Sequence, residues 1–207
     1  MKYLPLLLSI ACAGTHQAAH HSFANAEDWA QAFEDPSRDA WQKPDQVLAL
    51  LALPPDAKVA DIGAATGYFA VRASKLVPKG HVYGIDVESA MVDYLKARAE
   101  REELKNLTTV LASVDDAKLP EPVDVVLVVN TWHHLDDRIN YFKRLRESVR
   151  PGGRLVIIEF TRESSMGPIA TMKSTPDEVT AELRPAGWSL TTRSTILPEQ
   201  FLLIFTR

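Results

Sequence analysis

The stretch that decides the fold reads Lys58-Val-Ala-Asp-Ile-Gly-Ala-Ala-Thr-Gly-Tyr-Phe-Ala70. Val59 and Ile62 belong to a short apolar run that suits a buried strand, while Gly63 and Gly67 allow a sharp turn and a close approach to the main chain. The free N–H groups of the helix that follows favour an anionic group, such as a dinucleotide phosphate or the carboxylate of an amino-acid-derived cofactor. The stretch therefore predicts a strand, a tight turn and a helix start.

A second apolar run favours a ligand that contains ribose. Val82-Tyr-Gly-Ile-Asp86 ends in a carboxylate at the separation expected for an acid that accepts hydrogen bonds from ribose hydroxyls. The dinucleotide fingerprint Gly-x-Gly-x-x-Gly is absent, because the sequence from Gly63 reads Gly-Ala-Ala-Thr-Gly-Tyr. Two plainer interpretations stay open: an ordinary strand-to-helix turn at Gly63, and a capping or turn role for Asp86.

Polar side chains stand at the ends of several predicted strands. The run over residues 122–129 is nearly continuously apolar, as expected for a central parallel strand covered on both faces. Binding residues in such a sheet gather beyond the carboxyl ends of the strands. We therefore expect one crevice to contain four residues from different strand ends: Asp61, Asp86, Asp115 and Asn130.

Several segments between residues 57 and 160 follow one another in a recognisable order. They are Asp61 to Gly67, the acid Asp86, Asp115-Asp-Ala-Lys-Leu-Pro120, Asn130-Thr-Trp-His-His-Leu135 and Arg150-Pro-Gly-Gly-Arg-Leu155. This ordered set resembles the motifs of the class I S-adenosylmethionine-dependent methyltransferases. The resemblance implies an α/β fold with a Rossmann-like doubly wound sheet of about seven mostly parallel strands and an antiparallel C-terminal hairpin.

The resemblance also implies a cofactor, S-adenosyl-L-methionine, and roles for individual residues. Asp86 would bind the ribose, Met91 would form an apolar wall for the adenine, and Asp115 would contact the adenine edge. The first motif would comprise Asp61, Gly63, Ala65 and Gly67, with Ala65 at a position where a third glycine is common. The segment after the fourth strand would be the active-site loop.

Methyl transfer from a sulfonium mainly requires a positioned nucleophile and the exclusion of water, and a base only where the acceptor must lose a proton. His133 or His134 would serve as that base, with a pKa near neutrality. The alternative is that one histidine caps the next helix and the other fills space. Asn130 is the stronger candidate, because an amide at this strand end can contact either the cofactor or the acceptor.

The composition indicates one globular domain that acts on a small molecule. The 207 residues are 46% hydrophobic and 24% charged, which suits a sizeable core. The formal net charge is −4, and no basic run is interleaved with aromatic residues, so we expect a small-molecule acceptor and no nucleic acid. We divide the chain into residues 1–14, an N-terminal helical segment over 15–56 and a cofactor-binding methyltransferase domain over 57–207.

The first fourteen residues resemble a bacterial-type export signal. A positive charge precedes a short apolar run that ends in small residues and is too short to span a bilayer. Cleavage would follow Ala13 or Ala26; alternatively, Ser9-Ile-Ala-Cys12 resembles a lipoprotein box, with Cys12 as the site of a lipid anchor. We expect an exported protein, periplasmic or associated with the envelope, and an untargeted, cytoplasmic protein is the alternative.

Two further features precede the predicted domain. His16, His20 and His21 crowd a polar stretch without another ligand type at a recognisable spacing, so we interpret them as a solvated or substrate-contacting cluster and predict no metal site. In related methyltransferases, N-terminal segments fold over the active site. The aromatic residues around Trp41 would thus form a lid, and plain core packing is an equally good interpretation.

The C-terminal half predicts two helices and a hairpin. Asp136 and Asp137 would cap a helix with Ile139, Phe142 and Leu145 on its buried face. Thr175-Pro-Asp-Glu178 has the spacing of a capping box. Residues 188–196 and 200–206 flank Leu197-Pro-Glu199 and predict an antiparallel hairpin, which resembles the last two strands of the methyltransferase fold.

Two rival functions remain. A nicotinamide-dependent oxidoreductase would share the first turn and Asp86, but no Tyr-x-x-x-Lys pair follows the fourth strand. A non-catalytic binding protein on a methyltransferase scaffold is the more serious alternative, because of the export signal and because Ala65 replaces a glycine. It predicts weak or absent cofactor binding.

Overall fold

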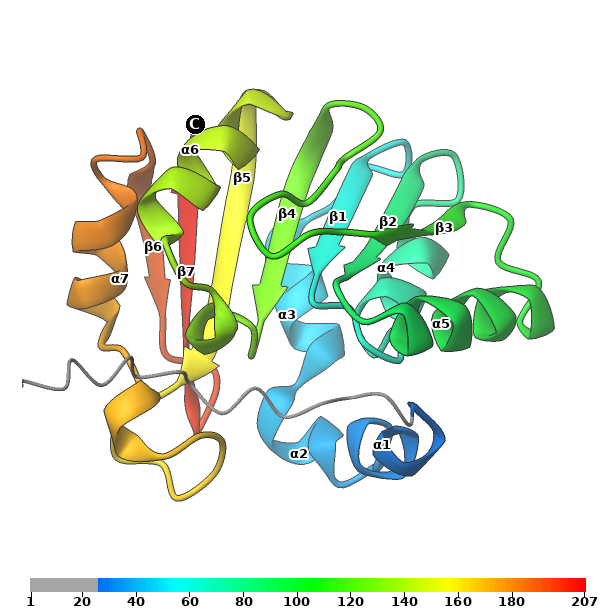
Figure 1. Cartoon of the computed structure of the whole chain (residues 1–207), viewed down its shortest axis with the longest axis horizontal. Helices are drawn as coiled ribbons and strands as arrows, with labels where there is room; N and C mark the ends of the chain where they lie inside the picture. Colours follow the sequence, from blue (N-terminus) through cyan, green and yellow to red (C-terminus); the bar gives the residue numbers. More distant parts are fainter. Residues whose placement is uncertain (1–25) are drawn as a thin grey trace, which may run out of the picture.

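The computed structural model describes residues 26–207, and these residues form a seven-stranded sheet in the order β3-β2-β1-β4-β5-β7-β6. The predicted signal, Cys12 and the histidine cluster lie outside the described residues. The strands are β1 (Lys58–Ile62), β2 (His81–Asp86), β3 (Leu107–Leu111), β4 (Val123–Val129), β5 (Val149–Phe160), β6 (Ser189–Ser194) and β7 (Gln200–Thr206). The first five strands are parallel, which confirms the predicted Rossmann-like sheet (Figure 1).

The predicted antiparallel ending is also confirmed. β7 lies between β5 and β6 and is antiparallel to both, so the hairpin joins the sheet through its second strand. The capping box predicted at residues 175–178 is present at the start of the helix Pro176–Leu183. Glu178 N–H donates to Thr175 Oγ1 at 3.2 Å, and Thr175 N–H donates to Glu178 Oε2 at 2.7 Å.

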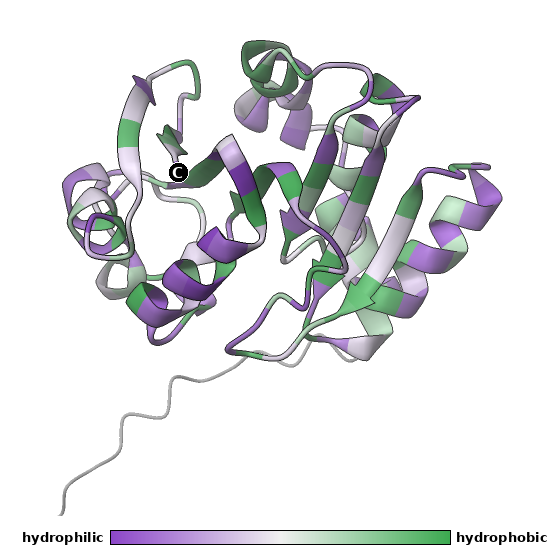
Figure 2. Cartoon of the chain, turned by 90° about the horizontal axis from the view of Figure 1, so that it is seen from above, coloured by the Kyte–Doolittle hydropathy of each residue, from purple (hydrophilic) through white to green (hydrophobic). Residues whose placement is uncertain are grey.

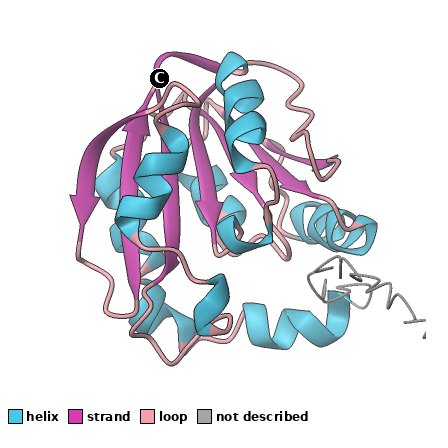
Figure 3. Ribbon diagram, turned by 60° about the vertical axis from the view of Figure 1, so that its left-hand side comes forward, coloured by secondary structure: helices cyan, strands magenta, loops and turns pink. Residues whose placement is uncertain are grey.

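Helices cover both faces of the sheet (Figure 3). One face packs against α3 (Pro44–Leu51), α4 (Ala70–Leu76) and α5 (Ser89–Arg101), and the other against α6 (Arg138–Glu147) and α7 (Pro176–Leu183). Alternate residues of β4 supply the two cores: Val125 and Leu127 face one, and Val126 and Val128 face the other. Figure 2 shows apolar residues concentrated in the strands, with hydrophilic residues prominent on the helices.

Two short N-terminal helices lie at the edge where the parallel strands end. α1 (Ala26–Phe33) and α2 (Arg38–Gln42) sit below the arrowheads of the parallel strands in Figure 1. Two 3₁₀ turns complete the described elements: η1 (Trp132–His134) after β4 and η2 (Ala170–Met172) after β5. None of the helices within residues 26–207 is both long and apolar enough to cross a membrane.

The start of α6 corrects two details of the sequence-based expectation. Asp137 precedes the helix, but its side chain accepts from Asn140 Nδ2 at 2.8 Å and caps no backbone N–H. Ile139 is 40% exposed, because the buried face is set by Tyr141, Phe142 and Leu145, and Ile139 lies outside that stripe.

Candidate cofactor and active site

The turn after β1 is closed by backbone hydrogen bonds. The N–H groups of Gly63 and Ala64 donate to the carbonyl of Ile85 at 2.8 and 3.0 Å, and Gly67 N–H donates to the carbonyl of Ala64 at 2.8 Å. Gly63 and Gly67 have φ values of +71° and +93°, which favour glycine. The predicted strand, tight turn and helix are therefore present.

Close packing adds a second reason for these glycines. A Cβ on Gly63 would lie 2.2 Å from Thr131 Oγ1, and a Cβ on Gly67 would lie 2.3 Å from Leu95 Cδ1. The first contact joins the turn to the segment after β4, and the second joins it to α5. The turn thus brings the predicted active-site loop directly against the first motif.

Asp86 is tied to the same turn. Its Oδ2 accepts from Ala65 N–H at 2.9 Å, and its Oδ1 accepts from Glu88 N–H at 3.0 Å. Burial raises the pKa of this carboxyl, although the backbone N–H groups favour its ionised form. Each carboxylate oxygen keeps a lone pair beyond these two bonds, which fits the vicinal hydroxyls of a ribose.

Asp61 is a second buried acid on the neighbouring strand. It is 3% exposed, and burial raises its pKa to about 7, against the opposing effects of a backbone hydrogen bond from Ala70 and the positive charge of Arg38. An acid in this position favours a nearby cation, which fits the amino group of an amino-acid-derived cofactor. Met91, in the first turn of α5, is 1% exposed.

Asn130 directly follows β4 in a left-handed conformation, with φ of +55°, which asparagine tolerates better than most residues. Its Oδ1 accepts from Gln200 Nε2, and Gln200 Oε1 accepts from Gln42 Nε2 at 3.0 Å. Gln42 Oε1 in turn accepts from Arg38 Nε. A buried polar chain therefore links α2, the start of β7 and the end of β4.

The two candidate histidines lie in different environments within η1. His133 Nδ1 is 2.7 Å from Glu159 Oε2, and the His133 side chain is 7% exposed. His134 is exposed, with its ring centroid 4.1 Å from that of His133. Trp132 anchors the loop, because it is fully buried and its Nε1 donates to Ser174 Oγ at 3.1 Å.

Asp115 lies on the segment that follows β3. It is exposed, it accepts from Ser113 Oγ at 2.8 Å, and its backbone carbonyl accepts from Arg144 Nε at 3.1 Å. The hydrogen bond from Ser113 lowers the pKa of the Asp115 carboxyl. Arg144 belongs to α6, and its Nη2 lies 4.0 Å from Asp115 Oδ2.

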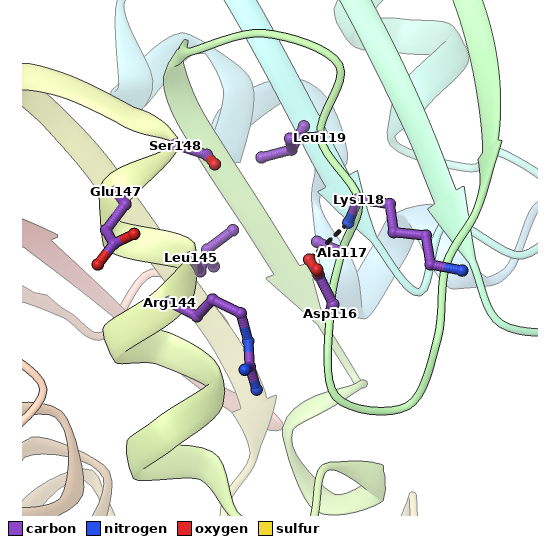
Figure 4. Close-up of a pocket in the computed structure, with 8 residues that line it drawn as sticks. All are labelled: Asp116, Ala117, Lys118, Leu119, Arg144, Leu145, Glu147 and Ser148. Atoms are coloured by element: carbon purple, nitrogen blue, oxygen red, sulfur yellow. Dashed lines mark hydrogen bonds between the residues drawn. The ribbon is translucent and has the colours of Figure 1, made fainter.

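A small pocket of about 180 Å³ lies beside Asp115, between the segment after β3 and α6 (Figure 4). It is lined by Asp116, Ala117, Lys118, Leu119, Arg144, Leu145, Glu147 and Ser148. None of the predicted site residues belongs to this lining, so the pocket is separate from the cluster at the strand ends.

A larger cavity of about 410 Å³ lies beside the start of β7. Its lining includes Gln200, which bonds Asn130, together with residues that follow β5, begin α7 and end β6. The two arginines of this lining are paired with acids: Arg162 with Glu178 at 2.8 Å and Arg193 with Asp177 at 3.0 Å. The cavity is lined by both polar and apolar surface, and Gln200 connects it to Asn130 after β4.

The N-terminal helices make specific contacts with the first turn. Glu34 accepts from Thr66 Oγ1 and forms an ion pair with Arg98, both at 2.6 Å. The guanidinium groups of Arg38 and Arg72 lie 3.9 and 4.1 Å from the ring centroid of Tyr68.

Trp41 packs on Phe160, with ring centroids 5.6 Å apart. These contacts place α1 and α2 over the end of β1 and the end of β5.

Sequence reasoning missed several of these residues. Glu159 interrupts the apolar run Leu155-Val-Ile-Ile-Glu-Phe160, and a lone charge in a central strand was a signal that could have identified it. Gln42, Gln200 and Arg38 carry no comparable signal, because their partners are distant in sequence. Within residues 26–207, no group of three or more His, Cys, Asp or Glu side chains is arranged to hold a metal ion.

Comparison with known proteins shows a similarity to methyltransferases. A family model described as a methyltransferase domain matches residues 59–153. An uncharacterized methyltransferase, YdaC, of Bacillus subtilis is 29% identical over 63% of this chain and 70% of its own length. The 27-O-demethylrifamycin SV methyltransferase of Amycolatopsis mediterranei is 28% identical over 69% of this chain, which spans only 58% of that longer protein.

The fold is shared with solved structures. A SAM-dependent methyltransferase from Aquifex aeolicus superposes with a TM-score of 0.80 and 27% identity, over 86% of this chain and 96% of that one. A TehB-like SAM-dependent methyltransferase from Corynebacterium glutamicum has a TM-score of 0.68 at 18% identity, which shows the shared fold alone. Together with the matched domain, these findings establish S-adenosylmethionine as the cofactor of a methyltransferase domain that is similar to those of the class I S-adenosylmethionine-dependent methyltransferases.

Proposed function

We propose that the chain methylates a small-molecule acceptor that binds beyond the ends of β4 and β5. The observation that carries this proposal is the packing of Thr131 against Gly63, where an added Cβ would lie 2.2 Å from Thr131 Oγ1. It holds the loop with Asn130 and His133 against the turn that carries the first motif. When bound, the cofactor supplies a methyl group on a sulfonium, so the chain mainly has to orient the acceptor and exclude water.

We assign the cofactor contacts by the chemistry of each residue. Asp86 accepts hydrogen bonds from the ribose, and Asp61 faces the amino group of the methionine part of the cofactor. The main chain of the turn formed by Gly63, Ala65 and Gly67 packs against the cofactor. Met91 and Asp115 bind the adenine in this proposal. For Asp115, this requires its carboxylate to turn away from Ser113, whose Oγ donates to it at 2.8 Å.

Asn130 and the two histidines serve the acceptor. The Oδ1 atom of Asn130 is engaged by Gln200, and no hydrogen bond within residues 26–207 uses its Nδ2, so that amide group is left for a ligand. His133 or His134 takes up a proton where the acceptor has one to lose. The 410 Å³ cavity beside Gln200 offers room for the acceptor.

The segment 15–56 acts as a lid in this proposal. In its described part, Glu34, Arg38 and Trp41 contact the turn after β1 and the end of β5, as expected for a cover over the strand ends. A cover here would exclude water from the reacting atoms.

We further propose that the protein is exported. The support is the sequence Met1 to Gly14, with its early lysine and short apolar run, and Ala11-Cys-Ala13 as a cleavage site. Fractionation of bacterial cells that express the full chain should place a shortened protein in the periplasm or the envelope. Full-length protein confined to the cytoplasm would contradict export, and incorporation of labelled palmitate that Cys12→Ala abolishes would identify the lipid anchor.

Transfer of a labelled methyl group tests the enzymatic proposal. The full chain, incubated with methyl-labelled S-adenosylmethionine and the low-molecular-weight fraction of a bacterial extract, should label a small molecule. At limiting cofactor, Asp86→Ala should lower the labelling by about 10- to 100-fold, because a buried charged hydrogen bond is lost. Asp93→Ala, which changes an exposed acid on α5, is the matched control. Label in protein or nucleic acid, or no transfer at all, would contradict a small-molecule methyltransferase.

A further inference from the structure

Glu159 is a fully buried carboxylate at the carboxyl end of β5. Its side chain is 0% exposed, and both of its oxygens are engaged. Oε1 accepts from Phe160 N–H at 2.9 Å, and Oε2 lies 2.7 Å from His133 Nδ1. A carboxylate accepts hydrogen bonds and does not donate them, so the hydrogen between Glu159 and His133 lies on Nδ1.

The other ring nitrogen of His133 remains open. No hydrogen bond within residues 26–207 uses His133 Nε2, and none of the described residues has a fully buried polar side-chain atom that lacks a hydrogen bond. Nε2 therefore reaches the surface of the site. A neutral imidazole with its proton on Nδ1 presents a lone pair on Nε2, which is the state required of a general base.

The backbone fixes this pair beside the first motif. Asn130 N–H donates to the carbonyl of Ile158 at 2.9 Å, so the start of the His133 loop is hydrogen-bonded to the residue before Glu159. Thr131, which lies between Asn130 and His133 in the sequence, packs against Gly63. These contacts hold the start of the His133 loop beside the carboxyl end of β5 and the first motif.

We propose that Glu159 is a positioning residue that keeps the His133 proton on Nδ1, so that Nε2 accepts a proton from a hydroxyl acceptor. This inference rests on the proposed function and specifies its substrate class. The acceptor oxygen uses the electron pair of its O–H bond to bind the methyl carbon, the electrons of the broken C–S bond return to sulfur, and the proton passes to Nε2 and then to water. A hydroxyl is a poor nucleophile until it loses its proton, so an oriented base is worth about 10²- to 10⁴-fold in rate.

The tautomer of His133 tests the role of Glu159 without an acceptor. Nitrogen NMR of the full chain labelled with ¹⁵N-histidine, at a pH where imidazoles are neutral, should show His133 protonated on Nδ1 and bare on Nε2; loss of the signal in His133→Gln assigns it. Glu159→Gln can donate to Nδ1 through its amide, so it should move the proton to Nε2 or mix the tautomers. Glu100→Gln, which neutralises an exposed acid on α5, should change nothing.

The wild-type spectrum alone decides the point if Glu159→Gln fails to fold. A wild-type proton on Nε2, or an unchanged tautomer in a folded Glu159→Gln variant, would overturn the positioning role. Calorimetric binding of S-adenosylmethionine to the same samples separates this result from a failure of the proposed function. With ¹³C-methyl cofactor, the product should carry its methyl group on oxygen, and a methyl group on nitrogen, sulfur or carbon would overturn the hydroxyl class.

Discussion

Ala65 illustrates how single residues in the first turn set the properties of the site. Its φ of +47° lies in the left-handed region that favours glycine, which gives a physical reason for the third glycine that the methyltransferase motif leads us to expect here. In this conformation, the Ala65 N–H reaches Asp86 Oδ2 at 2.9 Å. The missing glycine therefore leaves the turn in place and adds local strain.

Ala65→Gly should stabilise the protein. Relief of left-handed strain is worth about 1–2 kcal/mol, and the added flexibility of glycine in the unfolded chain costs about 0.5–1 kcal/mol, so the free energy of unfolding should rise by about 0.5–1 kcal/mol. Urea unfolding measures the difference. Ala64→Gly is the matched control: Ala64 lies in the core without a positive φ, so its replacement should destabilise the fold. Equal losses in both variants would contradict strain at Ala65.

Asp61 should make stability depend on pH. Its folded pKa of about 7 lies above the ordinary value of 3.8, so the folded state holds a proton that the unfolded state releases. Its contribution to stability is full below pH 3.8 and is lost as the pH rises toward 7, by at most about 4 kcal/mol. Asp61→Asn removes this titration. Its stability relative to wild type should therefore rise between pH 4 and pH 7 in chemical unfolding, and a constant difference would contradict the raised pKa.

At the scale of elements, the sequence predicts helices and strands that depend on local patterns, but it does not predict contacts between residues far apart in the chain. The strand 122–129, the helix 89–101 and the C-terminal hairpin follow from local periodicity and turn residues. The expectation that Ile139 is buried is wrong, because the apolar residues of this helix fit more than one helical face and the sequence alone does not show which face is buried. The link from Gln42 to Gln200 joins residues 158 positions apart, so no local pattern predicts it.

Gln42→Ala should loosen α2. The side chain is fully buried and bonds Gln200 and Arg38, so its removal leaves buried polar groups without partners and should lower the free energy of unfolding by about 2 kcal/mol. Hydrogen exchange should quicken first in α1 and α2. Gln31→Ala, an exposed change on α1, should leave both measurements unchanged. Faster exchange spread evenly over the sheet would contradict the idea that Gln42 stabilises only α1 and α2.

At the scale of the whole molecule, the sequence predicts the fold and much of the site because the strand ends converge. The order of the parallel strands brings Asp61, Asp86 and Asn130 to one edge of the sheet, as expected from strand ends alone. The role of Asp115 stays a prediction, and the hydrogen bond from Arg144 of α6 to its backbone carbonyl is a contact that strand ends alone do not predict. The sequence marks Glu159 as a lone charge in an apolar strand, but its partner His133 follows only from the pairing of β5 with β4.

Calorimetric titration of the full chain with S-adenosylmethionine, S-adenosylhomocysteine and NAD tests the central claim most directly. We expect micromolar binding of the first two and none of NAD, with Asp86→Ala weakening the binding by about 10- to 100-fold. Asp93→Ala serves as the control. Binding of none of the three would favour a non-catalytic scaffold, and binding of NAD, or unchanged affinity in Asp86→Ala, would contradict the assignment of this site.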